Sequence, residues 1–157
     1  MRATKKAGES RTEQQYLVRA THLNHYGRLF GGVLLAWIDE LAGVVATRHS
    51  NSYVTTAAID NLQFKGPAHE GDMVVLIGNV TYVGRSSMEI RVDTYIEAMD
   101  GTRVMINRAY IDMVAIDSNG VAVEVPDLIV ETEEERQEYE AAIKRKEMRM
   151  QRRRDGF

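Results

Sequence analysis

A polar loop that runs into an apolar helix carries the residues best suited to chemistry. It begins at Asn24, passes through the adjacent glycines Gly31 and Gly32, and reaches Asp39. Glycines let the backbone approach a ligand closely, and the first amides of a helix can polarise a carbonyl oxygen. Asp39 is a carboxylate within residues 33–45, a segment that is apolar around almost its whole circumference. A charge there is costly unless it has a partner or a task.

The spacing of these residues limits how they can act together. Eight residues of helix, at about 1.5 Å each, place Asp39 about 12 Å along the axis from Gly31. That distance is too long for both groups to act on one reacting carbon. The helix start of one subunit must therefore meet Asp39 of another, unless the ligand bends across the helix or the helix is broken. A two-fold dimer would contain two such composite sites, with Asn24 of one subunit opposite Asp39 of the other.

The histidines are a second group that could do chemistry, as metal ligands or proton carriers. His22 and His25 flank Asn24, whereas His49 and His69 fall at a helix end and in a loop. A metal would need a third ligand at a recognisable spacing, which this pattern does not offer. We therefore predict no metal site and no histidine in the catalytic role.

Composition and charge narrow the class of protein. The 157 residues are 44% hydrophobic and 27% charged, as expected for one globular domain, and the net charge of -3 gives no general attraction to polyanions. The absence of cysteine excludes disulfides and thiolate sites and fits a reducing compartment. Residues 1–19 lack the apolar stretch of a signal peptide, and no apolar run approaches the roughly 20 residues of a membrane span. We expect a cytoplasmic protein without membrane contact.

Hydrophobic periodicity and turn residues predict one long buried helix, a series of strands and a polar terminal helix. The expected strands are 15–20, 53–59 with an irregular continuation to 64, 72–83, 86–99 and 102–117, and the expected helices are 31–49 and 132–154. Residues 1–12 are expected to be flexible. We predict a domain over 1–128 and a charged C-terminal helix or tail over 129–157 of the same domain. The fold class is α+β, with a twisted antiparallel sheet around the long helix.

Strand 86–99 has the clearest alternation. One face would carry Met88, Ile90, Val92, Thr94 and Ile96, and the other Glu89, Arg91, Asp93 and Tyr95. This pattern is typical of an antiparallel strand with one side in water. The simplest topology for the strands is a meander.

Three segments, in order and at compatible spacing, resemble one family. They are Asn24-x-x-Gly27-x-x-Phe30-Gly31-Gly32 with Asp39 eight positions after Gly31, Asp60-x-x-x-Phe64-x-x-Pro67-x-x-x-Gly71-Asp72, and Val83-Gly84-Arg85-Ser86-Ser87-Met88-Glu89. Together they resemble the hotdog-fold acyl-CoA thioesterases, specifically the acyl-CoA hydrolase branch. The resemblance covers roughly residues 14 to 128 and says little about the charged tail.

The resemblance implies a hotdog fold and hydrolysis of acyl-CoA to the free acid and coenzyme A. The amides of Gly31 and Gly32 would bind the thioester oxygen, and Asn24 would orient the water or the carbonyl. Asp39 would act as a general base, or as a nucleophile that forms an anhydride. The family commonly forms homodimers that assemble as trimers of dimers. No cofactor is implied beyond the coenzyme A of the substrate.

The phosphates of coenzyme A require cationic and hydroxyl donors outside the reaction centre. Arg85, Ser86 and Ser87 resemble the family's coenzyme-contacting turn. Candidates for lining an acyl tunnel along the helix are Leu34, Trp37 and Leu41.

Alternatives remain open for residues and for function. Asn24 could be only a turn residue, Arg85 a solvated hairpin arginine, and Glu40 the working acid in place of Asp39. The protein could also bind acyl-CoA without turnover, as a sensor or regulatory subunit. An acyl dehydratase or hydratase is less favoured, because the His-Phe-Pro-type loop of the dehydratases is absent.

A basic cluster near the C-terminus could attract RNA, DNA or the 3′-phosphate of coenzyme A. It comprises Lys144, Arg145, Lys146, Arg149, Arg152, Arg153 and Arg154. No aromatic residues interleave these charges, so we predict no nucleic-acid binding. We interpret the cluster as the positive C-terminal end of a solvated helix.

Overall fold

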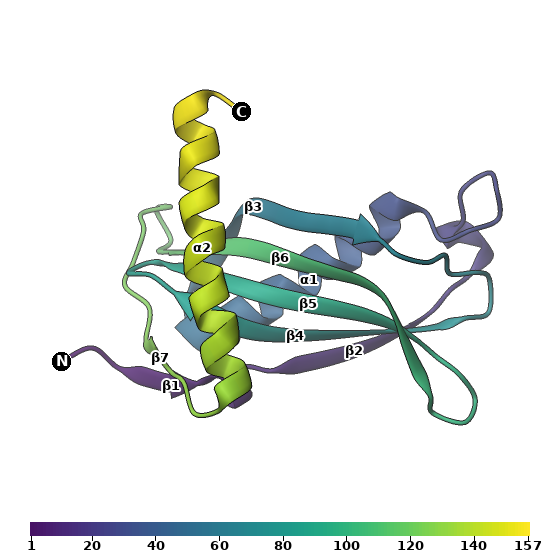
Figure 1. Cartoon of the computed structure of the whole chain (residues 1–157), viewed down its shortest axis with the longest axis horizontal. Coiled ribbons are helices and arrows are strands. Elements are labelled where there is room, and N and C mark those ends of the chain that lie inside the picture. Colours follow the sequence, from purple (N-terminus) through teal and green to yellow (C-terminus); the bar gives the residue numbers. More distant parts are fainter.

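A curled antiparallel sheet wraps one long helix, and a second helix crosses the other face of the sheet (Figure 1). The computed structural model describes the backbone of residues 1–157 and every side chain except that of Asn61. The helices are α1 (Gly31–Ser50) and α2 (Glu133–Asp155), with short 3-10 turns η1 (Ala7–Glu9) and η2 (Ala20–His22). The strands are β1 (Thr4–Lys6), β2 (Thr12–Leu17), β3 (Tyr53–Phe64), β4 (Met73–Val83), β5 (Ser87–Glu97), β6 (Arg103–Ile116) and β7 (Asp127–Ile129). The predicted α+β arrangement is confirmed.

The strand order β2-β4-β5-β6-β3 confirms the meander only for β4, β5 and β6. The prediction is wrong for the outer strands, since β2 pairs with β4 and β3 pairs with β6. The cause is α1, which lies between β2 and β3 in the chain and spans the concave face of the sheet. The chain therefore leaves one edge of the sheet and re-enters at the other, and β3 becomes a 12-residue edge strand.

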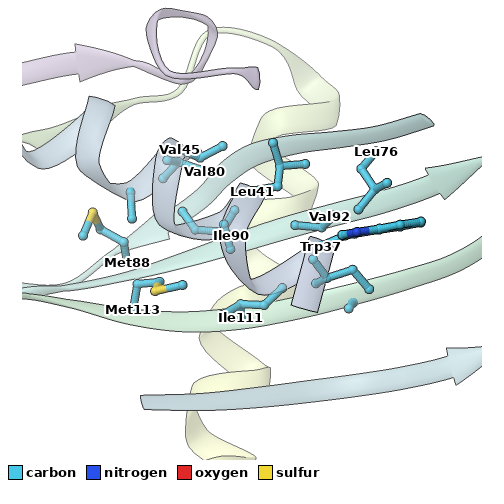
Figure 2. Packing of buried hydrophobic residues seen from close by; sticks show 14 of the residues in the cluster. Trp37, Leu41, Val45, Leu76, Val80, Met88, Ile90, Val92, Ile111 and Met113 are labelled. Carbon is cyan, nitrogen blue, oxygen red and sulfur yellow. The ribbon is translucent and has the colours of Figure 1, made fainter. Parts of the chain in front are cut away.

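The core lies between α1 and the concave face of the sheet (Figure 2). Leu41 and Val45 of α1 are fully buried against strand residues such as Ile90 and Ile111. The helix lies especially close to β4, where a Cβ added at Gly78 would be 2.8 Å from a Val45 methyl carbon. A larger residue at Gly78 would push α1 away from the sheet, so the helix is held at a fixed height over the strands.

Helix α2 covers the convex face of the sheet (Figure 1), which corrects the prediction that one side of β5 is in water. Glu89 and Asp93, assigned to the wet side, are only 1% and 4% exposed. Arg145 of α2 donates to both carboxylate oxygens of Glu89, at 2.8 and 3.0 Å. The alternation failed as a guide because the covering helix is itself polar and reaches the sheet through arginines.

Helix α2 begins with a capping box. The hydroxyl of Thr132 accepts a hydrogen bond from the amide of Glu135 at 3.1 Å, and the Glu135 carboxylate accepts from the amide of Thr132 at 3.4 Å. Its acidic first turn and basic last turn also complement the helix dipole. Arg145 and Arg149 nevertheless face the sheet, so the interpretation of the whole basic cluster as solvated is corrected for these two residues.

The N-terminal segment differs from its expected flexibility. Strand β1 pairs in parallel with β7, and the side chain of Lys5 donates to the carbonyl of Arg48 at 2.7 Å. Arg2 donates to the carbonyls of Val125 and Gly84. These contacts were invisible in the sequence because their partners lie 43 or more positions away. Within the described part of the chain, no helix is long and apolar enough to cross a membrane.

His49, near the end of α1, is a buried titratable residue whose environment can be tested by the pH dependence of stability. Its side chain is fully buried, its Nε2–H donates to the carbonyl of Pro126 at 2.9 Å, and its Nδ1 has no partner among the described residues. Burial lowers the pKa of this imidazole below its ordinary 6.5. The unfolded chain therefore takes up a proton at higher pH than the folded chain. The contribution of His49 to the free energy of unfolding is therefore fully present above the pKa of the histidine in the unfolded chain. It is lost as the pH falls from there through the lower pKa in the folded chain.

We expect the free energy of unfolding to decrease between pH 7.5 and pH 5.5, and His49→Gln to make that decrease shallower. Urea denaturation at both pH values measures the effect. His25→Gln, at an exposed position, is the matched control and should keep the wild-type pH dependence. An equal decrease in wild type and His49→Gln would contradict the assignment.

Candidate active site

Asn24 lies in a tight loop before α1 and has a clear structural task. Its Oδ1 accepts hydrogen bonds from the amides of Tyr26 (2.9 Å) and Arg28 (3.2 Å), and Gly27 adopts a positive φ of 76°. The turn interpretation of Asn24 is therefore confirmed for its oxygen. Its side-chain NH₂ donates to no acceptor within the described residues, so it is free to donate to a ligand.

The first amides of α1 are also free. The carbonyl of Phe30 accepts from Val33 at 3.0 Å, whereas the amides of Gly31 and Gly32 have no acceptor in the part of the chain that the structure describes. Two unpaired N–H groups therefore lie at the positive end of a 20-residue helix. This is the geometry predicted for a site that binds a carbonyl oxygen or oxyanion.

Both glycines are needed for close approach. A Cβ at Gly32 would lie 2.6 Å from the ring of Phe30, and one at Gly31 would lie 3.3 Å from the ring of Phe64. Side chains at these positions would displace the aromatic rings that flank the two amides.

A cavity of about 450 Å³ opens beside the helix start. Its polar lining includes Asn24, Arg28 and Lys65, and its apolar lining includes Leu34, Phe64 and Ile106. Leu34, an expected tunnel residue, reaches this cavity. Trp37 and Leu41 are not part of its lining and belong to the buried core. The tunnel prediction is therefore wrong for these two, and Trp37 instead stacks on Tyr16 with ring centroids 4.3 Å apart.

Asp39 lies further along α1, half-buried and among residues on the side away from the core. Its Oδ1 accepts a hydrogen bond of 2.6 Å from the hydroxyl of Thr56 on β3. Glu40 is exposed and makes no hydrogen bond or ion pair among the described residues. The structure thus favours Asp39 over Glu40 as the oriented carboxylate.

Sequence reasoning missed Thr56. It appeared only as one β-branched residue in a predicted strand, and no spacing rule links it to a carboxylate 17 positions earlier. The packing of β3 beside α1 brings the two side chains together. A search for hydroxyl residues at strand positions facing the helix could have proposed it, but only with the sheet order known.

The two groups of site residues are apart within one chain. Helix α1 is unbroken from Gly31 to Ser50, so Gly31 and Asp39 stay about 12 Å apart along its axis. The cavity beside Asn24 and Gly31 does not include Asp39 or Thr56 in its lining. One subunit therefore presents two half-sites.

The turn between β4 and β5 belongs with the Asp39 half. Ser87 is level with Val114 of β6, which is level with Thr55 of β3, the neighbour of Thr56. Arg85 is exposed at this turn, and Ser86 is half-buried. Asn24 lies toward the other end of the sheet, so the structure does not join Arg85, Ser86 and Ser87 to the cavity beside Gly31 within one chain.

The histidines near Asn24 have structural contacts. Nδ1 of His22 accepts from the amide of Arg19 at 3.0 Å, and its ring meets Trp37 edge-on. His25 packs on Tyr26. Among the described residues, no three His, Cys, Asp or Glu side chains are grouped so that they could hold a metal ion.

Comparisons with known proteins connect this geometry to a family. Residues 26–102 match the thioesterase superfamily. Over 147 residues the chain is 37% identical to an uncharacterized acyl-CoA thioester hydrolase, YkhA, of Bacillus subtilis, covering 93% of this chain and 86% of the relative. A crystal structure of an apo-hexameric acyl-CoA thioesterase superposes with a TM-score of 0.91 at 42% identity, covering 96% of this chain and 97% of the other.

The acyl-CoA hydrolase of Staphylococcus aureus provides a residue-level comparison. Its complex with butyryl coenzyme A, coenzyme A and coenzyme A disulfide superposes with a TM-score of 0.91 at 33% identity, covering 97% of this chain and 93% of that one. Alanine variants of that enzyme replace an asparagine, an aspartate 15 positions later and a threonine 17 positions after that. The same spacings separate Asn24, Asp39 and Thr56.

The match along the chain, the shared architecture and the spacing of the site residues agree: this chain belongs to the thioesterase superfamily and has the hotdog fold.

Proposed function

We propose that the protein is an acyl-CoA thioesterase that hydrolyses acyl-CoA to a carboxylic acid and coenzyme A, in sites shared between two subunits. The observation that carries this proposal is that α1 holds two groups that thioester hydrolysis needs, at two separate positions along the helix. Free amide donors lie at Gly31 and Gly32, and an oriented carboxylate lies at Asp39 on the same rigid helix. The similarity to acyl-CoA hydrolases supports the substrate class. A cytoplasmic location stays a prediction from composition.

The reaction needs an oxyanion stabiliser and a proton acceptor. Water attacks the thioester carbon while Asp39 takes its proton, and the carbonyl electron pair moves onto the oxygen held by the Gly31 and Gly32 amides. When the C=O bond re-forms, the C–S bond breaks and the coenzyme A thiolate leaves and regains the proton. In the alternative route, Asp39 attacks the carbon directly and the C–S bond breaks, so that the coenzyme A thiolate leaves and a mixed anhydride remains. Water then opens the anhydride, which releases the carboxylic acid and regenerates the Asp39 carboxylate, and the proton from water passes to the thiolate.

Thr56 and Asn24 have supporting roles in this mechanism. The Thr56 hydroxyl donates to Asp39 and fixes the orientation of its carboxylate. The Asn24 oxygen is occupied by backbone amides, so its free NH₂ can only donate, either to the thioester oxygen or to the oxygen of the attacking water.

A second copy of the chain is the partner that completes the site. In an antiparallel pair of α1 helices related by a two-fold axis near Leu35, Gly31 of one subunit is level with Asp39 of the other. In the single chain Leu35 is half-buried, and β3 is an edge strand that could pair with a strand of the second subunit. Exposed aromatic side chains near this face include Phe30 (53%), Tyr53 (70%) and Phe64 (54%). The hexameric relative supports assembly as a trimer of dimers.

We expect wild-type protein to release free thiol from acyl-CoAs, and Asp39→Asn to lower kcat by about 100-fold or more, the usual contribution of a positioned general base. The nearly isosteric change removes the base and retains the volume. A panel of acyl-CoAs from short to long measures the rate and the preferred chain length. Glu40→Gln, on the adjacent exposed residue, should retain wild-type kcat.

Full activity of Asp39→Asn would move the carboxylate role elsewhere. No thiol release by wild type across the panel, with acyl-CoA binding still measurable, would refute the enzyme and favour a non-catalytic acyl-CoA-binding protein.

Thr56→Val should lower kcat by about tenfold with little change in KM, because it removes the hydrogen bond that orients Asp39 but leaves substrate contacts intact. Thr56→Ser retains the hydroxyl and should recover most of the rate. Steady-state kinetics on one acyl-CoA measure the difference. A Thr56→Ser rate as low as that of Thr56→Val would argue against the hydroxyl as the positioning group.

Subunit mixing tests the shared site. Asn24→Ala and Asp39→Asn should each be nearly inactive alone, whereas a mixed dimer has one site with both wild-type halves and one site with neither. Activity should therefore return toward a quarter of the wild-type value after random exchange. Differently tagged subunits and native mass spectrometry verify exchange. Exchange without recovery would place the whole site within one subunit.

A further inference from the structure

Two buried polar residues lie opposite each other on β5 and β6, on the face of the sheet that α1 covers. Thr94 and Asn107 are cross-strand partners, and both residues are 0% exposed. Thr94 is on the same face of β5 as Ile90, which belongs to the core under α1. The hydroxyl of Thr94 and Oδ1 of Asn107 have no hydrogen-bond partner among the described residues. Unpartnered polar atoms in a core cost stability, so packing alone would favour apolar residues at both positions.

The side-chain nitrogen of Asn107, by contrast, has a specific partner. Its Nδ2 donates a hydrogen bond of 2.5 Å to the backbone carbonyl of Gln63 on β3. Because that neighbour is an acceptor, the side-chain atom that faces it must be the donor, and Oδ1 is the atom left unpaired. An apolar side chain of similar size could not make this contact. The hydrogen bond to β3 is therefore the property that asparagine supplies at this position.

The contact lies at an irregular part of an edge strand. Strand β3 is at the end of the sheet, with β6 as its neighbour, and its register shifts between Asp60 and Gln63. Such a shift interrupts the backbone ladder and bends the strand. Beyond the shift, the strand end is held by the side chain of Asn107 and by the amide of Lys65, which donates to the carbonyl of Ile106 at 2.8 Å. Asn107 thus supplies one of the contacts that hold the end of β3 on the sheet.

Phe64, which follows Gln63, connects the strand end to the candidate active site. Its Cζ atom lies 3.3 Å from the position that a Cβ would take at Gly31, so the ring packs on the first residue of α1. Phe64 also lines the cavity beside Asn24. A shift of the strand end would therefore move the ring that borders the free amide of Gly31.

We propose that Asn107 is a positioning residue for the half of the site that binds the thioester oxygen. Its side-chain amide holds the carbonyl of Gln63, and this contact keeps the Phe64 ring in place against Gly31 at the wall of the cavity. The inference rests on the proposed thioesterase function. Asn107 is fully buried and acts through Phe64, and its contribution is to the geometry in which the helix amides meet the oxyanion.

Steady-state thiol release tests this role. Asn107→Leu should lower kcat by about tenfold and change KM by less than about threefold, because a misplaced wall affects the transition state more than the bound substrate. Asn107→Val, a smaller residue that favours strands, removes the same donor and should give the same loss. Thr94→Val is the matched control, since it removes the unpartnered hydroxyl directly opposite, and it should retain wild-type kcat. Circular dichroism and native mass spectrometry verify that each variant is folded and assembled as wild type.

A double-mutant cycle distinguishes positioning from a general effect on structure. Phe64→Leu should itself lower kcat, because it replaces the ring that packs on Gly31. In the Phe64→Leu protein, the further change Asn107→Leu should cost less than about twofold, because the group that Asn107 positions is already absent. A purely structural role for Asn107 would instead give two losses that multiply.

Hydrogen exchange tests the hold on β3 without reference to activity. The amide of Lys65 should exchange at least about fivefold faster in Asn107→Leu than in wild type, because the strand end opens more often. In Thr94→Val it should exchange at the wild-type rate.

Three results would overturn the inference. They are a wild-type kcat in Asn107→Leu and Asn107→Val, losses that multiply in the double variant, and an unchanged exchange rate of the Lys65 amide. Failure of the wild-type protein to release thiol would instead refute the proposed function. The exchange rates would then still show whether Asn107 holds the end of β3.

Discussion

The rigidity of α1 is the constraint on which the proposed site depends. Twenty residues of unbroken helix keep the free amides of Gly31 and Gly32 about 12 Å from Asp39, and the close contact at Gly78 fixes the helix on its own sheet. No side-chain rearrangement can close that gap. In the proposed dimer, a second subunit brings its own α1 alongside, and the groups assigned to catalysis then meet across the interface.

Ion pairs on the convex face of the sheet link α2 to β3, the strand that carries Thr56. Arg149 and Arg152 of α2 hold Asp60, which lies on β3 four positions after Thr56. The arginine layer therefore anchors the strand whose hydroxyl orients Asp39, from the opposite side of the sheet. Removing one member of such a buried network would leave an uncompensated charge, so we expect the ion pairs to hold α2 on the sheet.

Much of the fold could be predicted because it depends on local patterns. The apolar run over 31–49, the turn residues between β4, β5 and β6, and the capping box at Thr132 each specify an element from neighbouring residues. The positions of β2 and β3 could not be predicted, since they depend on where α1 delivers the chain. Glu89 was misplaced in water because its cover comes from α2, 56 positions away at Arg145.

For the site, the amino-acid sequence by itself determined the chemical groups: Asn24, the glycine pair, Asp39 and, through helix geometry, their separation along one axis. Only the tertiary structure decided their partners. Thr56 reaches Asp39 through the packing of elements distant in the chain. The physical reason is range, because helix rise and turn chemistry act over a few residues, whereas hydrogen-bond partners across a sheet are set by which strands become neighbours.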